Sequence, residues 1–112
     1  MLRDTLRDAT VLGRSLEDTM ADRLDDDAVA AALTRLDGWS RAGDTIVREF
    51  EFGDFVDAIG FIAKVGVLAE RKNHHPELSN VYNRVRIELS THDAGSITEL
   101  DVSLAGEINE RV

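Results

Sequence analysis

All three histidines of the chain, His74, His75 and His92, lie in the segment 70–101, together with the only proline and the only tyrosine. Histidine exchanges protons near neutral pH more readily than any other side chain. The chain has 112 residues and gathers all of its imidazoles in this one segment. We therefore expect its acid–base chemistry to take place there.

Three interpretations of these histidines are open from the residues alone: unconnected surface or capping residues, a metal site of three imidazoles, or a metal-free acid–base site. Adjacent histidines such as His74 and His75 seldom bind one ion, and the spacing to His92 matches no standard zinc pattern. The sequence also has no cysteine, which excludes thiolate zinc sites, disulfides and thiol nucleophiles. We therefore expect no metal in this segment.

Length and composition indicate a single globular domain. The chain of 112 residues can bury a modest core, and 43% apolar with 31% charged residues is typical of a soluble protein. The excess of 22 acidic over 13 basic residues gives a net charge of −9. Because phosphate contacts require a cationic surface, we do not expect direct binding to nucleic acid.

The sequence predicts no membrane segment and no secretory signal. Its apolar stretches are far shorter than the roughly 20 residues that span a bilayer. The N-terminus carries acidic residues and has no uninterrupted apolar run. A cytoplasmic location is the expectation.

The elements that must position the histidines follow from the spacing of apolar residues. Residues 1–23 form an N-terminal extension that is either helical or loosely ordered, and residues 24–112 form the domain. The domain begins with a helix over 24–36, in which Asp25 or Asp26 is the N-cap and Gly38 is the stop signal.

A β-hairpin over 39–52, with its turn at 42–44, follows this first helix. The longest helix is predicted over 54–73, with Asp54 as the N-cap. Pro76 disfavours helix at the residue before it, so the adjacent histidines lie just past the helix end. Trp39 and Phe61 are expected to face the core. So are the apolar residues at helical spacing in the long helix: Phe55, Ile59, Ile62, Val65, Leu68 and Ala69.

Two more strands, 78–82 and 84–89, are predicted on either side of a turn near Asn83, and the second alternates apolar with charged residues. A last helix begins at Thr98, with Asp101 in capping-box position and an apolar stripe through Leu100, Leu104, Ile108 and Val112. One-sided strands and amphipathic helices predict an α+β fold. We expect two layers, with a four-stranded antiparallel sheet, helices on one face in a β2αβ2α arrangement, and an added N-terminal helix.

The histidine segment resembles the signature of the pterin-4a-carbinolamine dehydratases. That signature places a charged residue, two adjacent histidines followed by proline, an aromatic residue, a third histidine and an aspartate at fixed intervals. The matching residues are Glu70, His74, His75, Pro76, Tyr82, His92 and Asp101. Similarity in the flanks, such as the run VYNRVRIELSTHDAG, extends the resemblance from about Leu24 to the C-terminus.

The resemblance implies dehydration of 4a-hydroxytetrahydropterin to quinonoid dihydropterin, which regenerates the cofactor used by aromatic amino-acid hydroxylases. A base takes a proton from a ring nitrogen and an acid protonates the leaving hydroxyl, and two histidines can do this without a metal or other cofactor. By the same resemblance, His74 and His92 are the acid–base pair and His75 orients the pterin. The other pocket residues that it implies are Asn73, Ser90, Thr91, Asp93 and Asp101, the last of which holds a histidine or the pterin.

The resemblance has two departures and one alternative. Mammalian members have aspartate where Asn73 stands, and Ser96 occupies a position that is often glycine. Family members form dimers or tetramers, so a homo-oligomer is expected. The family also includes transcriptional coactivators and assembly chaperones, so a non-enzymatic interaction protein on this scaffold is the alternative, although the intact histidines favour the enzyme.

Overall fold

The computed structural model describes residues 21–112. The predicted extension, 1–23, therefore lies outside the described residues except for its last three. Of these, Arg23 forms a β-bridge with Thr98 and donates from Nη2 to the Gly95 carbonyl at 3.3 Å. The Leu24 N–H donates to the Ile97 carbonyl at 2.9 Å, so the chain enters the domain beside the start of the last helix.

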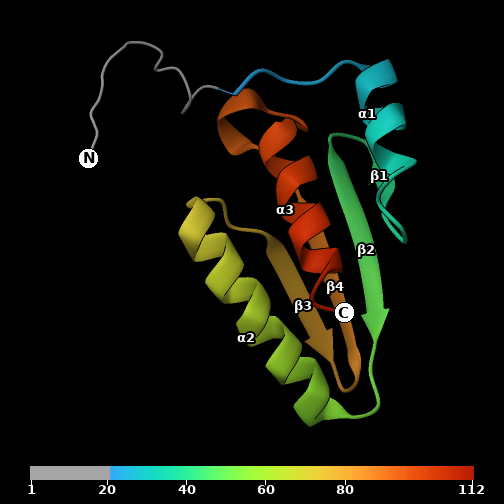
Figure 1. Ribbon diagram of the computed structural model, residues 1–112, viewed down its shortest axis with the longest axis vertical. Coiled ribbons are helices and arrows are strands. Elements are labelled where there is room, and N and C mark those ends of the chain that lie inside the picture. The colour runs from blue at the N-terminus through green and yellow to red at the C-terminus, as the bar shows by residue number, and fades with distance from the viewer. Residues whose placement is uncertain (1–20) are drawn as a thin grey trace.

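Along the described residues, helices alternate with pairs of strands. The elements are α1 (Asp26–Leu33), β1 (Ser40–Ala42), β2 (Thr45–Glu51), α2 (Phe55–Lys72), β3 (Glu77–Val81), β4 (Arg84–Leu89), a short 3-10 helix η2 (His92–Ala94) and α3 (Glu99–Asn109). The strands form one antiparallel sheet in the order β1-β2-β4-β3. Figure 1 shows α2 and α3 on one face of this sheet, with α1 at the β1 edge. The predicted two-layer α+β fold is confirmed.

The helix N-termini form where the sequence places capping side chains. The Asp25 carboxylate accepts from the Ala28 N–H at 2.8 Å, and Asp54 accepts from the Asp57 N–H at 2.8 Å. At α3, Thr98 and Asp101 form the predicted capping box. These caps satisfy backbone donors that have no partner within the helix, so the local sequence fixes where each helix starts.

Two helix ends differ from the prediction. The first helix ends at Leu33, not near Gly38, because the N–H groups of residues 34–36 bond back only three residues and close a tighter turn. The last helix ends at Asn109, so Val112 is exposed and does not join the core.

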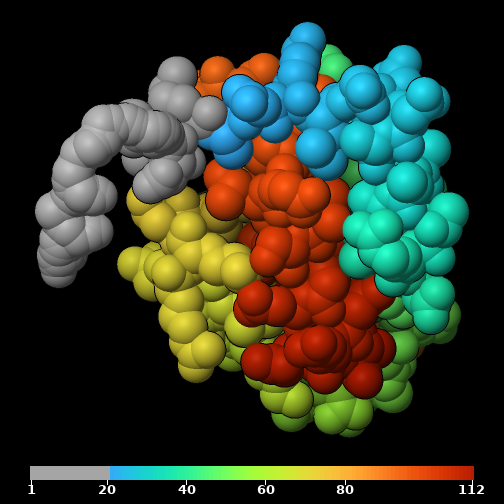
Figure 2. Space-filling view, turned by 45° about the horizontal axis from the view of Figure 1, so that its top comes forward, coloured from blue at the N-terminus to red at the C-terminus, as the bar shows by residue number. Residues whose placement is uncertain are grey.

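The core lies between the sheet and the helices, and it includes Trp39 and Phe61 as predicted. Phe55 and Ile59 were expected there, but they are 49% and 44% exposed. The buried stripe of α2 runs through Ala58, Phe61, Val65, Leu68 and Ala69. Each helical residue is rotated by 100° from the one before it, which turns Phe55 and Ile59 onto the flank away from the sheet. On the side seen in Figure 2, the α3 side chains lie between those of α1 and the C-terminal part of α2.

Candidate active site

The C-terminus of α2 sets the direction of the two adjacent histidines. Asn73 ends the helix in the left-handed conformation, with φ 50°, and its N–H donates to the Glu70 carbonyl at 3.2 Å. The His74 N–H donates to the Ala69 carbonyl at 3.1 Å. Asparagine tolerates this conformation better than most residues, and Pro76 prevents the helix from resuming. The reversal turns His74 inward and leaves His75 outside.

His74 is held by a buried carboxylate. Its ring Nε2 lies 2.6 Å from Asp101 Oδ1, and the two side chains are 10% and 0% exposed. Asp101 sits in the first turn of α3, where its other oxygen, Oδ2, accepts the Thr98 N–H at 2.8 Å. The helix cap and the histidine partner are therefore the same residue, and both roles that the sequence offered for Asp101 are present.

A third element completes this cluster. Thr91 lies between β4 and η2, where its N–H donates to the Ser96 carbonyl at 2.8 Å. Its hydroxyl donates to Asp101 Oδ2 at 2.8 Å. The end of α2, the segment after β4 and the start of α3 therefore meet at one carboxylate. A buried charge is costly without such partners, and Asp101 has three of them: His74, Thr91 and Thr98.

A surface pocket of about 530 Å³ opens in front of His74. Lys72 and Leu100 line this pocket, together with five predicted site residues: Asn73, His74, Thr91, His92 and Asp93. His92 begins η2 and is exposed, and its ring makes no hydrogen bond within residues 21–112. The pocket therefore has a buried, fixed imidazole on one side and an exposed imidazole on another segment.

Several predicted site residues lie outside this lining. His75 is exposed, and its Nε2 lies 2.9 Å from Glu70 Oε1 at the end of α2. Ser90 is half-buried next to Thr91. Tyr82 occupies the β3–β4 turn with φ 53° and is 64% exposed. Because β3 carries the chain away from Pro76 at about 3.3 Å per residue, Tyr82 lies at the far end of the hairpin.

Lys72 and Leu100 are pocket residues that the sequence did not reveal. Lys72 is the last residue of α2, and its Nζ lies 2.9 Å from Glu107 Oε2 and 3.1 Å from Ser103 Oγ, both on α3. Leu100 was assigned to the apolar stripe of the last helix, but it is only half-buried and faces the pocket. In the sequence, only the position of Lys72 next to Asn73 could have indicated that it lines the pocket. Nothing in the sequence indicated this for Leu100.

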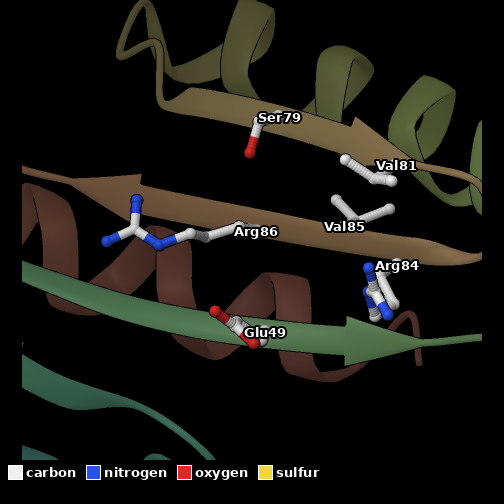
Figure 3. A pocket seen from close by; sticks show the side chains of 6 residues that line it. All are labelled: Glu49, Ser79, Val81, Arg84, Val85 and Arg86. Carbon is white, nitrogen blue, oxygen red and sulfur yellow. The ribbon is translucent and has the colours of Figure 1, made fainter.

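A second, shallower pocket of about 200 Å³ lies on the opposite, open face of the sheet. Figure 3 shows its side chains on three neighbouring strands, with Glu49 on β2 and Arg84 and Arg86 on β4. Within residues 21–112, no group of three histidine, cysteine or acidic residues is arranged to hold a metal ion. No helix in that range is long and apolar enough to cross a bilayer.

Together, these features define a small two-layer α+β protein with a surface pocket lined by two histidines. The model of the family described as pterin 4 alpha carbinolamine dehydratase matches residues 22–111. The chain therefore belongs to this family.

Individual relatives agree. The chain is 49% identical over 92 residues to a Nitrobacter hamburgensis protein named "Putative pterin-4-alpha-carbinolamine dehydratase", covering 80% of this chain and 91% of that one. A Rhizobium johnstonii protein of the same name is 51% identical over 86 residues, covering 75% and 85%.

Solved structures agree as well. A Brucella melitensis transcriptional coactivator/pterin dehydratase is 41% identical with a TM-score of 0.78, covering 80% of this chain and 98% of that one. A pterin dehydratase-like RuBisCO assembly factor of the α-carboxysome is 18% identical with a TM-score of 0.55, covering 65% and 84%, and it shares the fold alone.

Proposed function

We propose that the protein is a cytoplasmic 4a-hydroxytetrahydropterin dehydratase in which His74 and His92 are the acid–base pair. The observation that carries this proposal is the 2.6 Å contact between His74 and the buried Asp101, at a pocket whose other wall carries His92. A carboxylate behind an imidazole orients the ring and stabilises the imidazolium that forms when it takes a proton. His74 is thus suited to be the base.

The elimination needs a base and an acid at the same time. His74 removes the proton from the pterin ring nitrogen, and the freed electron pair forms the C=N bond. The C4a–oxygen bond breaks, and the hydroxyl leaves as water after it takes a proton from His92. The two imidazoles come from different segments, the end of α2 and the start of η2, so they can approach opposite sides of the substrate. Such groups typically contribute 10²–10⁴-fold each, and no metal or other cofactor takes part.

The remaining predicted residues have supporting roles. Asn73 and Asp93 line the pocket, where their side chains can bind the polar edge of the pterin. His75 lies outside the lining and pairs with Glu70, so we assign it to orienting the substrate at the pocket mouth. Neither Ser90 nor Tyr82 has a role in this scheme.

The deciding experiment is direct turnover of 4a-hydroxytetrahydropterin by purified protein, followed against the spontaneous reaction. We expect acceleration by the wild type and near-background rates in His74→Ala and His92→Ala, with circular dichroism as the folding control. A wild type that does not accelerate the reaction would contradict the proposal and favour the interaction-protein alternative.

We also propose that the protein forms a homo-oligomer through the outer flank of α2. Val56, Ile59 and Val67 are exposed there, and a Cβ added at Gly60 or Gly66 would meet nothing within 4 Å. In an antiparallel pair of α2 helices centred on Ala63, Ile59 meets Val67 and Gly60 meets Gly66. The flank is thus complementary to itself, as a two-fold interface requires.

Light scattering at micromolar concentration tests this assembly. We expect a dimer or tetramer in the wild type and a smaller species in Ile59→Glu, whose side chain is exposed in the single subunit. The matched control is Val81→Glu, which adds the same charge to an exposed residue of β3 and should leave the mass unchanged. A monomeric wild type would contradict the proposal.

A further inference from the structure

Three buried polar residues between β4 and α3 form one hydrogen-bond network: Thr91, Thr98 and Asp101. Asp101 Oδ2 accepts from the Thr98 N–H and from the Thr91 hydroxyl, each at 2.8 Å. Thr91 Oγ1 lies 2.6 Å from Thr98 Oγ1, which in turn accepts the Leu100 N–H at 3.2 Å. Thr98 and Asp101 are fully buried and Thr91 nearly so. Water therefore cannot readily replace a group that is removed from this hydrogen-bond network.

Each hydroxyl proton in this hydrogen-bond network has only one available acceptor. A carboxylate oxygen can only accept, so the Thr91 hydroxyl gives its single proton to Asp101. The Thr91 oxygen must then accept from the Thr98 hydroxyl, whose own oxygen accepts a backbone N–H. The hydrogen bonds from Leu100 through Thr98 and Thr91 therefore all run toward the Asp101 carboxylate.

This direction determines the protons on the catalytic imidazole. Asp101 Oδ1 lies 2.6 Å from His74 Nε2. An ionised carboxylate can only accept, so Nε2 carries a hydrogen. We propose that Thr91 is a positioning residue, which keeps Asp101 an acceptor and so holds neutral His74 with Nδ1 bare. Nδ1 is then the atom that removes the pterin proton. This assignment of the reacting atom rests on the proposed function, in which His74 is the base.

The first test needs no substrate and no mutation. Long-range ¹H–¹⁵N spectra of histidine-labelled wild type separate a protonated from a bare ring nitrogen when the imidazole is neutral. We expect the Nε2 signal of His74 at the position of a protonated nitrogen and the Nδ1 signal at that of a bare one. The reverse pattern would overturn the proposal.

The second test removes the hydroxyl while keeping the shape of the side chain. In Thr91→Val, Asp101 loses one donor, so we expect the Nε2 and Nδ1 signals of His74 to move toward a tautomer mixture. We expect a roughly 10- to 100-fold fall in kcat, the factor that a hydrogen bond to a charged group would supply if it were lost only in the transition state. KM should change little, because the Thr91 hydroxyl is already engaged by Asp101 and Thr98.

Two matched variants separate positioning from packing. Thr91→Ser keeps the hydroxyl without the methyl group, so it should restore the His74 spectrum and most of kcat. Ser96→Ala removes a buried hydroxyl from the bridge partner of Thr91, but that hydroxyl contacts Asp44 and not Asp101, so kcat should stay near the wild-type value. A wild-type spectrum and kcat in Thr91→Val, or equal defects in the Val and Ser variants, would overturn the role.

Failure of this proposal and failure of the proposed function give different results. A wild type without turnover removes the dehydratase assignment, while its spectrum still shows whether His74 carries the proton on Nε2. A wild type with turnover but with the proton on Nδ1 keeps the dehydratase and removes the role of Thr91. If Thr91→Val does not fold, the wild-type spectrum still decides which ring nitrogen of His74 carries the proton, and Thr91→Ala, which also lacks the hydroxyl, tests the role of Thr91.

Discussion

Two polar pairs in this molecule have similar geometry and very different surroundings. His74 and Asp101 meet at 2.6 Å behind the candidate pocket, where the side chains are 10% and 0% exposed. Arg86 and Glu88 meet at 2.9 Å on the open face of the sheet, where they are 45% and 25% exposed. Figure 3 shows that open face, with Arg86 extended along the strands and the helices behind.

Burial makes the contact between His74 and Asp101 rigid, and a rigid polar contact can serve as part of a site. Asp101 must have its partners, because an unpaired buried charge is costly, and its three donors fix both the carboxylate and the His74 ring. Arg86 and Glu88 can exchange each other for water at little cost. The buried His74 ring is held in the orientation that the reaction needs, whereas the side chains of a solvated pair are not held in one orientation. Mutations should therefore affect activity at the first pair and hardly at all at the second.

The largest expected effect comes from reversing the hydrogen bond at the buried pair. In Asp101→Asn the amide oxygen can still accept from Thr98 and Thr91, so the amide NH2 faces His74 Nε2 and forces that nitrogen to accept. The wrong tautomer at an Asp–His pair can lower kcat by about 10⁴-fold. Steady-state kinetics of the purified variant measures this loss.

The control for this variant is thermal unfolding, because Asp101 also caps α3. The asparagine side-chain oxygen can still accept the Thr98 N–H of the capping box, so the fold should be retained. A folded Asp101→Asn protein with wild-type kcat would show that the buried pair is structural only.

The second effect separates the two imidazoles of the pocket. His74→Ala and His92→Ala should each lower kcat by about 10²–10⁴-fold. Only His74→Ala should also lower stability, because it removes the partner of the buried Asp101 Oδ1, at a cost of about 1–3 kcal/mol. Kinetics and urea unfolding of both variants measure the contrast, and equal loss of stability in the two would contradict it.

If the two histidines act in one step, their losses do not add. The double variant should then be much less impaired than the product of the two single effects. Near wild-type kcat in both single variants would remove His74 and His92 from the mechanism.

The sequence predicted the members of the site better than their surroundings. Spacing and resemblance brought His74, His92 and Asp101 together, and the capping pattern placed Asp101 at the start of α3. Neither indicated that Thr91 donates to Asp101, because that contact depends on how the segment after β4 packs against α3. In the same way, helical spacing placed Phe55 in the apolar pattern of the long helix, but it did not determine which flank of α2 the sheet would cover.

A smaller effect is expected at the exposed neighbour of His74. His75 pairs with Glu70 at the end of α2 and lies outside the pocket lining. In the proposed scheme it orients the substrate, so its loss should weaken substrate binding more than the chemical step. His75→Ala should therefore raise KM with a modest change in kcat, the pattern of lost uniform binding. Saturation kinetics measures the two constants, and a fall in kcat as large as that of His74→Ala would move His75 into the acid–base pair.

The smallest effect is expected at the solvated pair on the open face. Hydrogen bonds from the Arg86 guanidinium first, and from Thr45 next, hold the pKa of Glu88 below its ordinary value. A depressed pKa in the folded state means that the stabilisation is complete above the ordinary glutamate range and is lost as the pH falls through the folded value. Glu88→Gln should therefore lower the free energy of unfolding at pH 7 by less than about 1 kcal/mol, with kcat unchanged. Urea unfolding at neutral and at acidic pH tests this, because the difference between wild type and variant should vanish on acidification. A difference that persists at acidic pH would come from packing and not from charge, and a loss of kcat would mean that the open face is coupled to the site.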